Sequence, residues 1–326
     1  MLKRVLTIAF LGLLLVLPFF LGRYHMYVVN LVGISVILAL GLALLTGFTG
    51  QISLGHAAFF GIGAYASALL TSKLAIPFWF SCPLGGVLAA LISLGIGLPA
   101  LRIRGHYLAL ATLGFGQIIQ LILIHWDSLT NGPRGLVVAR PALGGLKFSS
   151  DSTYYYVILI VTAALTWFSW NLVRSRIGRA FISIRDSAVA SASLGINLTK
   201  YKVLAFLLSS FYAGVAGSLY GPLVKFIDPL GFGLWQSALY LMMIVVGGMA
   251  SIPGALIGAV LLTVLPEILR GFAQYREVIY GVALLLCLIF IPRGIYGLFR
   301  DVGRKMKPKT IVVESPEKVL YEKEVA

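Results

Sequence analysis

Long apolar segments dominate this sequence and constrain its fold more than any other feature. Ten of them follow one another between short polar connections, and each is close to the ~20 residues that a helix needs to cross the hydrocarbon core of a membrane. Of the 326 residues, 59% are hydrophobic and 11% are charged, which excludes an ordinary soluble domain. We therefore predict an all-α, polytopic membrane protein with about ten transmembrane helices, at residues 5–21, 27–45, 51–70, 79–98, 107–124, 154–172, 203–224, 232–249, 252–269 and 278–291.

The basic residues predict how these helices are oriented. Cytoplasmic segments of membrane proteins are enriched in Lys and Arg, and a cytoplasmic N-terminus places most of the 26 basic residues on the cytoplasmic side. Both termini are then cytoplasmic. We expect residues 1–300 to form a transmembrane domain and residues 301–326 a flexible cytoplasmic tail. An eight-span arrangement, in which residues 51–70 or 252–269 are re-entrant, has the same sidedness and is an alternative.

The net charge of +15 does not indicate a nucleic-acid-binding protein. The excess of Lys and Arg lies in short connections and in the tail. There it is explained by the orientation of the helices in the membrane and by attraction to anionic membrane lipid. Cys82 and Cys287 lie in separate apolar segments, so neither a disulfide framework nor a metal cluster is expected.

One basic connection, residues 173–202, stands out from this pattern, because its Lys and Arg residues surround a single acidic residue, Asp186. Small and apolar residues recur there three or four positions apart, the spacing of one helical face: Phe181, Ile184, Ala188, Ala192 and Gly195. Asp186 or Ser187 can cap a second helix, and Gly195 can end it, because glycine tolerates the left-handed conformation. We predict two short cytoplasmic helices with a small apolar face that a partner could hold. An ordinary solvated anchor is the alternative.

Groups that catalysis or ion coupling would need are missing from the predicted spans. An ion-coupled carrier keeps a buried carboxylate or histidine for its ion, but Glu267 lies at a span end and His56 in the first turns of the third span. His56, His106 and His125 show no ligand or catalytic spacing. The chain also lacks the Gly-x-x-x-x-Gly-Lys-[Ser/Thr] phosphate-binding loop. We therefore expect no enzyme activity and no cofactor, and any energy from ATP must come through partner subunits.

Two glycine-rich turns, residues 45–55 and 246–254, are similar to each other. Internal duplication is common in transporters, whose substrate paths lie beside broken helices, but glycines can equally let helices approach closely. The match is too short to establish a duplication. Gln51, Ser53 and His56 follow the first turn and are our candidates for polar contacts along a translocation path. For His56, a hydrogen-bonded packing role is the alternative.

Several motifs follow one another along the chain: TGFTGQISLGHAAFFGIGAY (46–65), RGHYLALATLGFG (104–116), TNGPRGL (130–136), SRIGRAF (175–181), AGVAGSLY (213–220) and VVGGMASIPGALIG (245–258). In this order they resemble the membrane subunit of branched-chain amino acid ABC importers, LivM type, over roughly residues 28–300. The resemblance implies an ABC importer permease that pairs with a second permease subunit, two ABC ATPase subunits and an extracytoplasmic substrate-binding protein, in the bacterial cytoplasmic (inner) membrane.

The same resemblance implies that the helices of residues 173–202 couple the permease to the ATPases. The candidate coupling residues are Arg179, Phe181, Ile184, Arg185, Asp186 and Gly195. Ala188 and Ala192 stand where the family usually has Glu and Arg, which puts polar contacts from those two positions in doubt. ATP would be used by the partner subunits alone.

The implied cargo is a branched-chain, hydrophobic amino acid, moved inward by alternating access. Related permeases carry urea, short-chain amides or sugars, so the cargo is inherited by analogy alone. A stand-alone channel for a small neutral solute and an ion-coupled secondary carrier are the other functions that we weigh.

Overall fold

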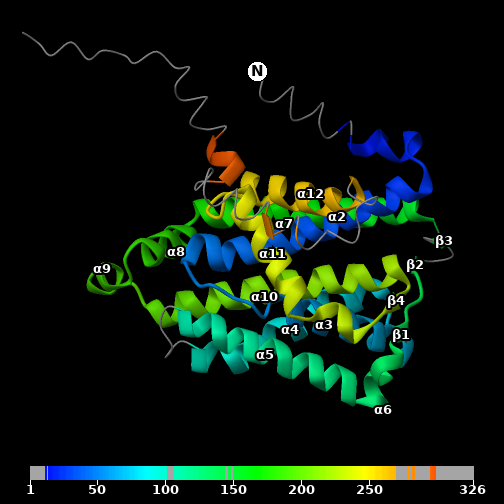
Figure 1. Ribbon diagram of the computed structural model, residues 1–326, viewed down its shortest axis with the longest axis horizontal. Helices are drawn as coiled ribbons and strands as arrows, with labels where there is room; N and C mark the ends of the chain where they lie inside the picture. Colours follow the sequence, from blue (N-terminus) through cyan, green and yellow to red (C-terminus); the bar gives the residue numbers. More distant parts are fainter. Residues whose placement is uncertain are drawn as a thin grey trace, which may run out of the picture.

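The computed structural model describes residues 12, 14–100, 106–143, 146–147, 150–268, 278, 281–282 and 294–298. Almost all regular structure in these residues is helical (Figure 1). The α-helices are α2 (Arg23–Leu42), α3 (His56–Ser72), α4 (Phe78–Ala100), α5 (His106–His125), α6 (Asp127–Thr130), α7 (Asp151–Arg174), α8 (Arg176–Asp186), α9 (Ala188–Ser193), α10 (Leu198–Val224), α11 (Leu234–Gly247) and α12 (Ile252–Ile268). The other elements are a π-helical turn η1 (Ala43–Gly47), 3-10 turns η2 (Gly132–Arg134) and η3 (Pro229–Phe232), and strands β1 (Leu136–Val137), β2 (Ala142–Leu143), β3 (Leu146–Lys147) and β4 (Phe226–Ile227).

Several helices are long and apolar enough to cross a membrane, as the sequence predicts for a multi-pass protein. Those of span length are Arg23–Gly47, Phe78–Gly95, Tyr107–His125, Asp151–Arg174 and Leu198–Val224. Predicted spans 5–21 and 278–291 lie partly outside the described residues, and the tail 301–326 lies wholly outside them. Ten spans with both termini cytoplasmic therefore stay a prediction.

Two predicted spans differ from the helices that form. The helix expected over residues 51–70 begins only at His56 in α3, because the preceding residues form a break. The span expected over residues 232–249 is the 14-residue helix α11, whose length of roughly 21 Å is less than a hydrocarbon core of about 30 Å. In Figure 1, α11 runs across the direction of the other helices, and it contacts α12 and α2 on one side and α3 and α5 on the other.

The central helix is α10, which packs against α4, α3 and α2. Glycines bring these backbones together: a Cβ on Gly217 of α10 would overlap the carbonyl oxygen of Phe60, and a Cβ on Gly63 of α3 would overlap the backbone of Gly214. The Ser218 hydroxyl donates to the carbonyl of Gly63 at 3.1 Å. Small residues at helix crossings, joined by hydroxyl hydrogen bonds, are the packing that a membrane favours.

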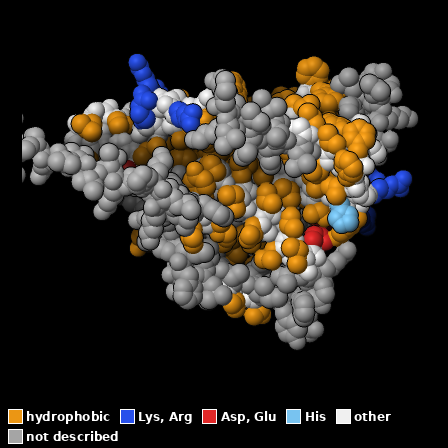
Figure 2. All heavy atoms as spheres, turned by 90° about the horizontal axis from the view of Figure 1, so that it is seen from above, with side chains coloured by type: hydrophobic (Ala, Val, Ile, Leu, Met, Phe, Trp, Pro, Cys, Tyr) orange, Lys and Arg blue, Asp and Glu red, His pale blue; other side chains and the backbone are white. Residues whose placement is uncertain are grey.

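The bundle has two different ends. The loop end carries α8 and α9, and the strand end carries the antiparallel pairs β1 with β4 and β2 with β3 (Figure 1). Figure 2 shows hydrophobic side chains over the face between the two ends, with Lys and Arg toward each end. At the loop end, residues 174–202 hold one acidic residue, Asp186, and six basic ones, which are Arg174, Arg176, Arg179, Arg185, Lys200 and Lys202.

Candidate functional site

A break in the helical backbone lies at the loop end. The helix that starts with α2 passes into the π-helical turn η1, stops at Thr49 and restarts at His56 with α3. At Gly50 the chain turns with a φ of +72°, a conformation that favours glycine. Within a membrane, irregular backbone of this kind is tolerated only where protein buries it or where it lines a cavity, and π-turns often occur at functional sites.

Side chains from neighbouring helices bind the amides freed by this break. The Thr112 hydroxyl in α5 accepts from the backbone N–H of Leu54 at 3.0 Å, and the Ser237 hydroxyl in α11 accepts from the N–H of Ala57 at 3.0 Å. The start of α3, which has no side-chain cap of its own, is therefore held by two other helices. Sequence analysis did not identify Thr112 and Ser237, although each is a small polar residue on a largely apolar helix.

Of the three candidate path residues, Gln51 and Ser53 lie in this break and His56 begins α3, and each is buried. The Gln51 amide donates to the Thr49 hydroxyl at 3.0 Å and to the carbonyl of Lys202 at 3.4 Å. The Ser53 hydroxyl accepts from the N–H of Gly55 at 3.4 Å. Gln51, Ser53 and His56 make hydrogen bonds to other protein groups and not to one another. Contact of these residues with a cargo stays a prediction.

His56 has a protein partner at each ring nitrogen. Nε2 lies 3.1 Å from the carbonyl oxygen of Leu38, and Nδ1 lies 3.4 Å from the Ser209 hydroxyl. Because a carbonyl can only accept, Nε2 carries the proton and Nδ1 accepts from Ser209. With 1% of its surface exposed, His56 has the surroundings of a packing residue that joins α3 to α2 and α10.

The predicted pair of short helices in residues 173–202 is confirmed as α8 and α9. The Ser187 hydroxyl caps α9 by accepting from the N–H of Ala190 at 3.2 Å. Gly195 has a φ of +80°, and the amides of Gly195 and Ile196 donate back to the carbonyls of Ala192 and Ser191 at 3.0 Å. These two hydrogen bonds form a Schellman motif, which ends the helix as predicted.

The predicted apolar face of this loop needs a correction. Phe181 is 0% exposed and Ile184 is 4% exposed, because α8 lies against α7 and α10 of the same chain. These side chains are covered by the protein itself and are not presented to a partner. The large exposed apolar side chains of the loop are Val189 of α9, at 82%, and Leu194, at 78%; Ala192 of the predicted face is also exposed.

The charged candidates of the loop have different contacts. Arg179 is exposed, and its guanidinium donates to the carbonyl of Arg174 within the same loop at 3.3 Å. Arg185 makes an ion pair with Asp186 at 2.8 Å, and its Nη1 donates to the carbonyl of Gly47 in the helix break at 3.3 Å. The loop is therefore joined to the break through Arg185.

The two glycine-rich turns meet beside this contact. A Cβ on Gly47 would overlap the carbonyl oxygen of Met249, and a Cβ on Gly294 would overlap the backbone of Gly248. We call these four residues the glycine junction. Sequence analysis identified the two turns but not their contact. The junction shows the close backbone approach that glycine permits, and it does not establish a duplication.

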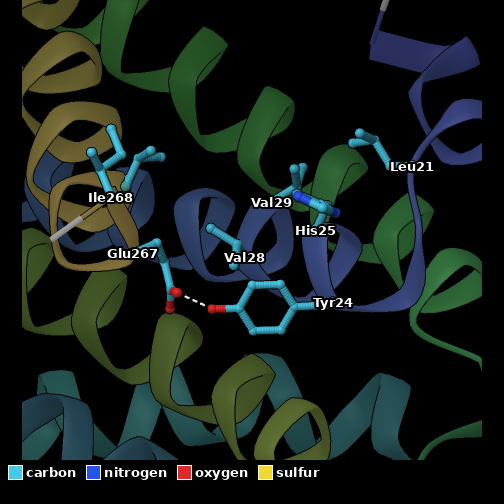
Figure 3. Close-up of a pocket in the computed structure, with 8 residues that line it drawn as sticks. Leu21, Tyr24, His25, Val28, Val29, Glu267 and Ile268 are labelled. Carbon is cyan, nitrogen blue, oxygen red and sulfur yellow. Dashed lines mark hydrogen bonds between the residues drawn. The ribbon is translucent and has the colours of Figure 1, made fainter. Parts of the chain in front are cut away.

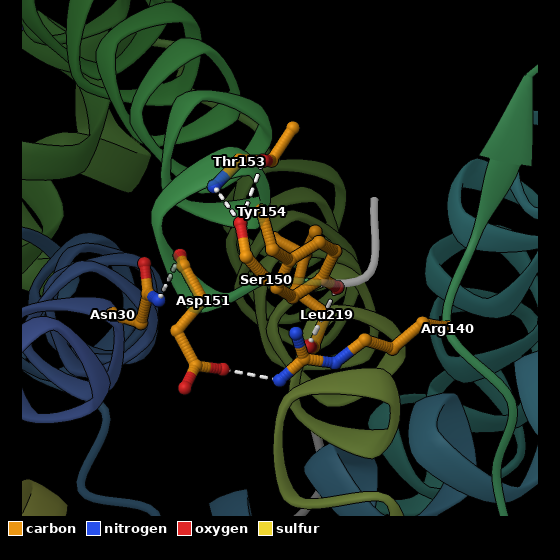
Figure 4. Close-up of polar contacts among 7 residues, drawn as sticks. All are labelled: Asn30, Arg140, Ser150, Asp151, Thr153, Tyr154 and Leu219. Carbon is orange, nitrogen blue, oxygen red and sulfur yellow. Dashed lines mark hydrogen bonds and ion pairs between the residues drawn. The ribbon is translucent and has the colours of Figure 1, made fainter. Parts of the chain in front are cut away.

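Polar residues form a cluster at the strand end (Figure 4). Arg140 and Asp151 form an ion pair, the Asn30 side chain donates to the carbonyl of Asp151 at 3.0 Å, and Tyr154 donates to the carbonyl of Leu219 at 2.9 Å. Beside them lies a cavity of about 370 Å³ lined by Arg23, Arg140, Ser150, Asp151, Ser152 and Lys225. A second, mostly apolar cavity of about 520 Å³ lies where the Tyr24 hydroxyl donates to Glu267, between α2 and α12 (Figure 3).

Comparison with known proteins gives a consistent set of relatives. A family model described as "Branched-chain amino acid transport system / permease component" matches residues 24–291. The chain is 33% identical to the high-affinity branched-chain amino acid transport system permease protein LivM of Salmonella typhimurium, over 91% of this chain and 76% of that protein. It is 29% identical to the permease protein LivH of the same kind of system in Escherichia coli, over 80% and 90%, and 26% identical to the autoinducer 2 import system permease protein LsrC of Escherichia coli, over 93% and 91%. No solved structure gives a significant match.

Proposed function

Because the chain belongs to the family of permease components of branched-chain amino acid transport systems, and is of the LivM type, we propose that it is the membrane-spanning subunit of an ATP-driven ABC importer. The observation that carries this proposal is the match over residues 24–291, which includes the helix break, the α8–α9 loop and both glycine-rich turns. The complex would contain a second permease subunit, two ATPase subunits and an extracytoplasmic binding protein in the bacterial cytoplasmic membrane. Two permeases, LivM and LivH, are named for the same kind of transport system, which supports a pair of different permease subunits.

Helix α9 and the residue that follows it, Leu194, are the proposed docking point for the ATPases. Val189 and Leu194 expose their apolar side chains beside a cluster of basic residues. A small apolar knob with a charged surround is a suitable contact for a groove on a soluble subunit. ATP-driven movement at this point would switch the membrane helices between inward-facing and outward-facing states.

Branched-chain amino acids are the proposed cargo, from the names of the relatives. The similarity to LsrC, named as an autoinducer 2 import permease, favours a second candidate: a permease of the same mechanism with another small cargo. Urea and amides belong to the same set of alternatives.

Reconstitution tests the proposal. Proteoliposomes with the complete complex, including the ATPases and the binding protein, are expected to accumulate leucine only with ATP, and excess isoleucine or valine should compete. The chain alone should show no flux. Flux through the chain alone would instead establish a channel, and uptake driven by an ion gradient without ATP would establish a secondary carrier. Competition by urea or autoinducer 2 but not by isoleucine would replace the cargo and keep the mechanism.

The proposed sidedness gives a separate prediction. Val137 at the strand end and Val189 at the loop end are equally exposed, at 81% and 82%, so cysteines at the two positions form a matched pair. With Cys82 and Cys287 replaced by Ala, Val137→Cys should react with an impermeant thiol reagent added to intact cells. Val189→Cys should react only after the membrane is permeabilised, so that the reagent reaches the cytoplasmic side. The reverse labelling pattern would contradict the orientation and the charge rule behind it.

A further inference from the structure

The contact between Arg185 and Gly47 joins two parts of the chain that are 138 residues apart in sequence. Gly47 lies in the last turn of the helical segment formed by α2 and η1, where backbone carbonyls lack helical partners and carry partial negative charge. A guanidinium is a suitable donor to such a carbonyl. Arg185 therefore acts as a cap that comes from the α8–α9 loop and not from the helix itself.

The position of the Arg185 side chain is closely defined. Its Nε and Nη2 both donate to Asp186, at 3.0 and 2.8 Å, which orients the plane of the guanidinium so that Nη1 meets the carbonyl of Gly47. The aliphatic stem lies against Gly50, where an added Cβ would be 3.2 Å from Cγ of Arg185. Helix α8 can therefore move only a short distance before the Arg185 side chain displaces Gly50 in the helix break.

The contact continues to the second turn. Gly47 is packed on the carbonyl of Met249, and Gly248 is packed on Gly294, so the two turns cannot move toward each other. Close-packed backbones transmit displacement because they have no compressible space between them. A shift at Gly47 would reach the turn between α11 and α12.

We propose that Arg185 is the positioning residue that connects the ATPase-docking loop to the helix break, so that displacement of α8 and α9 moves the glycine junction and changes the state of the translocation path. The proposal rests on the function proposed above. It differs from a docking role, because Arg185 acts through Gly47 within the same chain. Arg185→Lys keeps a positive charge and a hydrogen-bond donor but not the planar guanidinium, so it provides a control.

The test compares Arg185→Met with Arg185→Lys in the complete transport complex. Methionine keeps an unbranched stem against Gly50 and removes the donor to Gly47. In Arg185→Met we expect unchanged recovery of the ATPase subunits and a fall of at least tenfold in leucine transported per ATP hydrolysed, the scale expected for a lost hydrogen bond from a charged donor. Arg185→Lys, which keeps a cation and a donor, should lose less of this transport ratio than Arg185→Met. A normal transport ratio in Arg185→Met would overturn the proposal, as would loss of ATPase recovery, because the latter would make Arg185 a docking residue.

A second measurement separates coupling from a merely structural role. In the unmodified complex, ATP binding should change backbone amide hydrogen exchange at residues 43–51, and in Arg185→Met this change should be absent although the thermal unfolding temperature is kept. Arg185→Lys, which restores a cation and a donor, should recover part of the change. An ATP-dependent change of full size in Arg185→Met would remove Arg185 from the coupling route. Absence of ATP-dependent uptake by the unmodified complex would instead contradict the proposed function itself, so the two failures are distinguishable.

Discussion

Replacing Gly217 with Leu is expected to abolish the folded protein. A Cβ at this position would overlap the carbonyl oxygen of Phe60 and approach the backbone of Ala64, and backbone atoms cannot move aside as a flexible side chain can. Helices α3 and α10 would have to separate, which would also open the contact between Gly63 and Gly214. Overpacking of a core costs roughly 1–3 kcal/mol or more, and this site adds the loss of neighbouring contacts. Size-exclusion chromatography in detergent should show no monodisperse peak.

The matched control is Gly114 in α5, where an added Cβ meets no atom within 4 Å. Both glycines lie inside helices, where exchange for Ala favours the helix by about 1 kcal/mol. Gly114→Leu should therefore leave the chromatographic profile unchanged, and Gly114→Ala should leave the thermal unfolding temperature unchanged or raise it. Gly217→Ala should lower that temperature because overlap exceeds the gain in helix propensity. Equal effects of the two Ala substitutions would show that α3 and α10 do not meet as closely as described.

Exchange of both Val189 and Leu194 for Ser is expected to prevent recovery of the ATPase subunits without loss of stability. Both side chains are exposed in this chain, so their removal should leave its thermal unfolding temperature unchanged. Burial of each against a partner would contribute roughly 1.5–3 kcal/mol, and together they would strengthen binding by two or more orders of magnitude. Detergent pull-downs through the permease should therefore lose the ATPases, and substrate-stimulated ATP hydrolysis should disappear.

The control exchanges both Phe181 and Ile184 for Ser, and here we expect the permease itself to lose stability. These side chains are buried by α7 and α10, so their truncation leaves cavities and lowers the thermal unfolding temperature of the permease. If the variant with both Val189→Ser and Leu194→Ser recovers the ATPases and transports normally, the docking role of α9 is contradicted. The loop would then serve only to orient the chain in the membrane.

Local rules account for what could be predicted of the candidate site. Ser187 caps α9 and Gly195 ends it because capping and helix termination involve only residues within a few positions of each other. The family match was also accessible from the order of motifs. The same rules failed at α3, whose apolar run starts at residue 51 while its helix starts at His56, since Thr112 and Ser237 from distant helices stabilise the broken backbone.

The sequence by itself determined that this protein is helical, that several of its helices are long and apolar enough to cross a membrane, and that two short helices lie in the basic connection. These features depend on the length of apolar runs and on capping, and both are determined by residues that are close together in the sequence. Only the tertiary structure decided which side of α8 is covered, that both nitrogens of His56 have protein partners, and that Arg185 reaches Gly47. The physical reason is that periodicity shows which residues share a face, whereas the group that covers that face comes from another part of the chain.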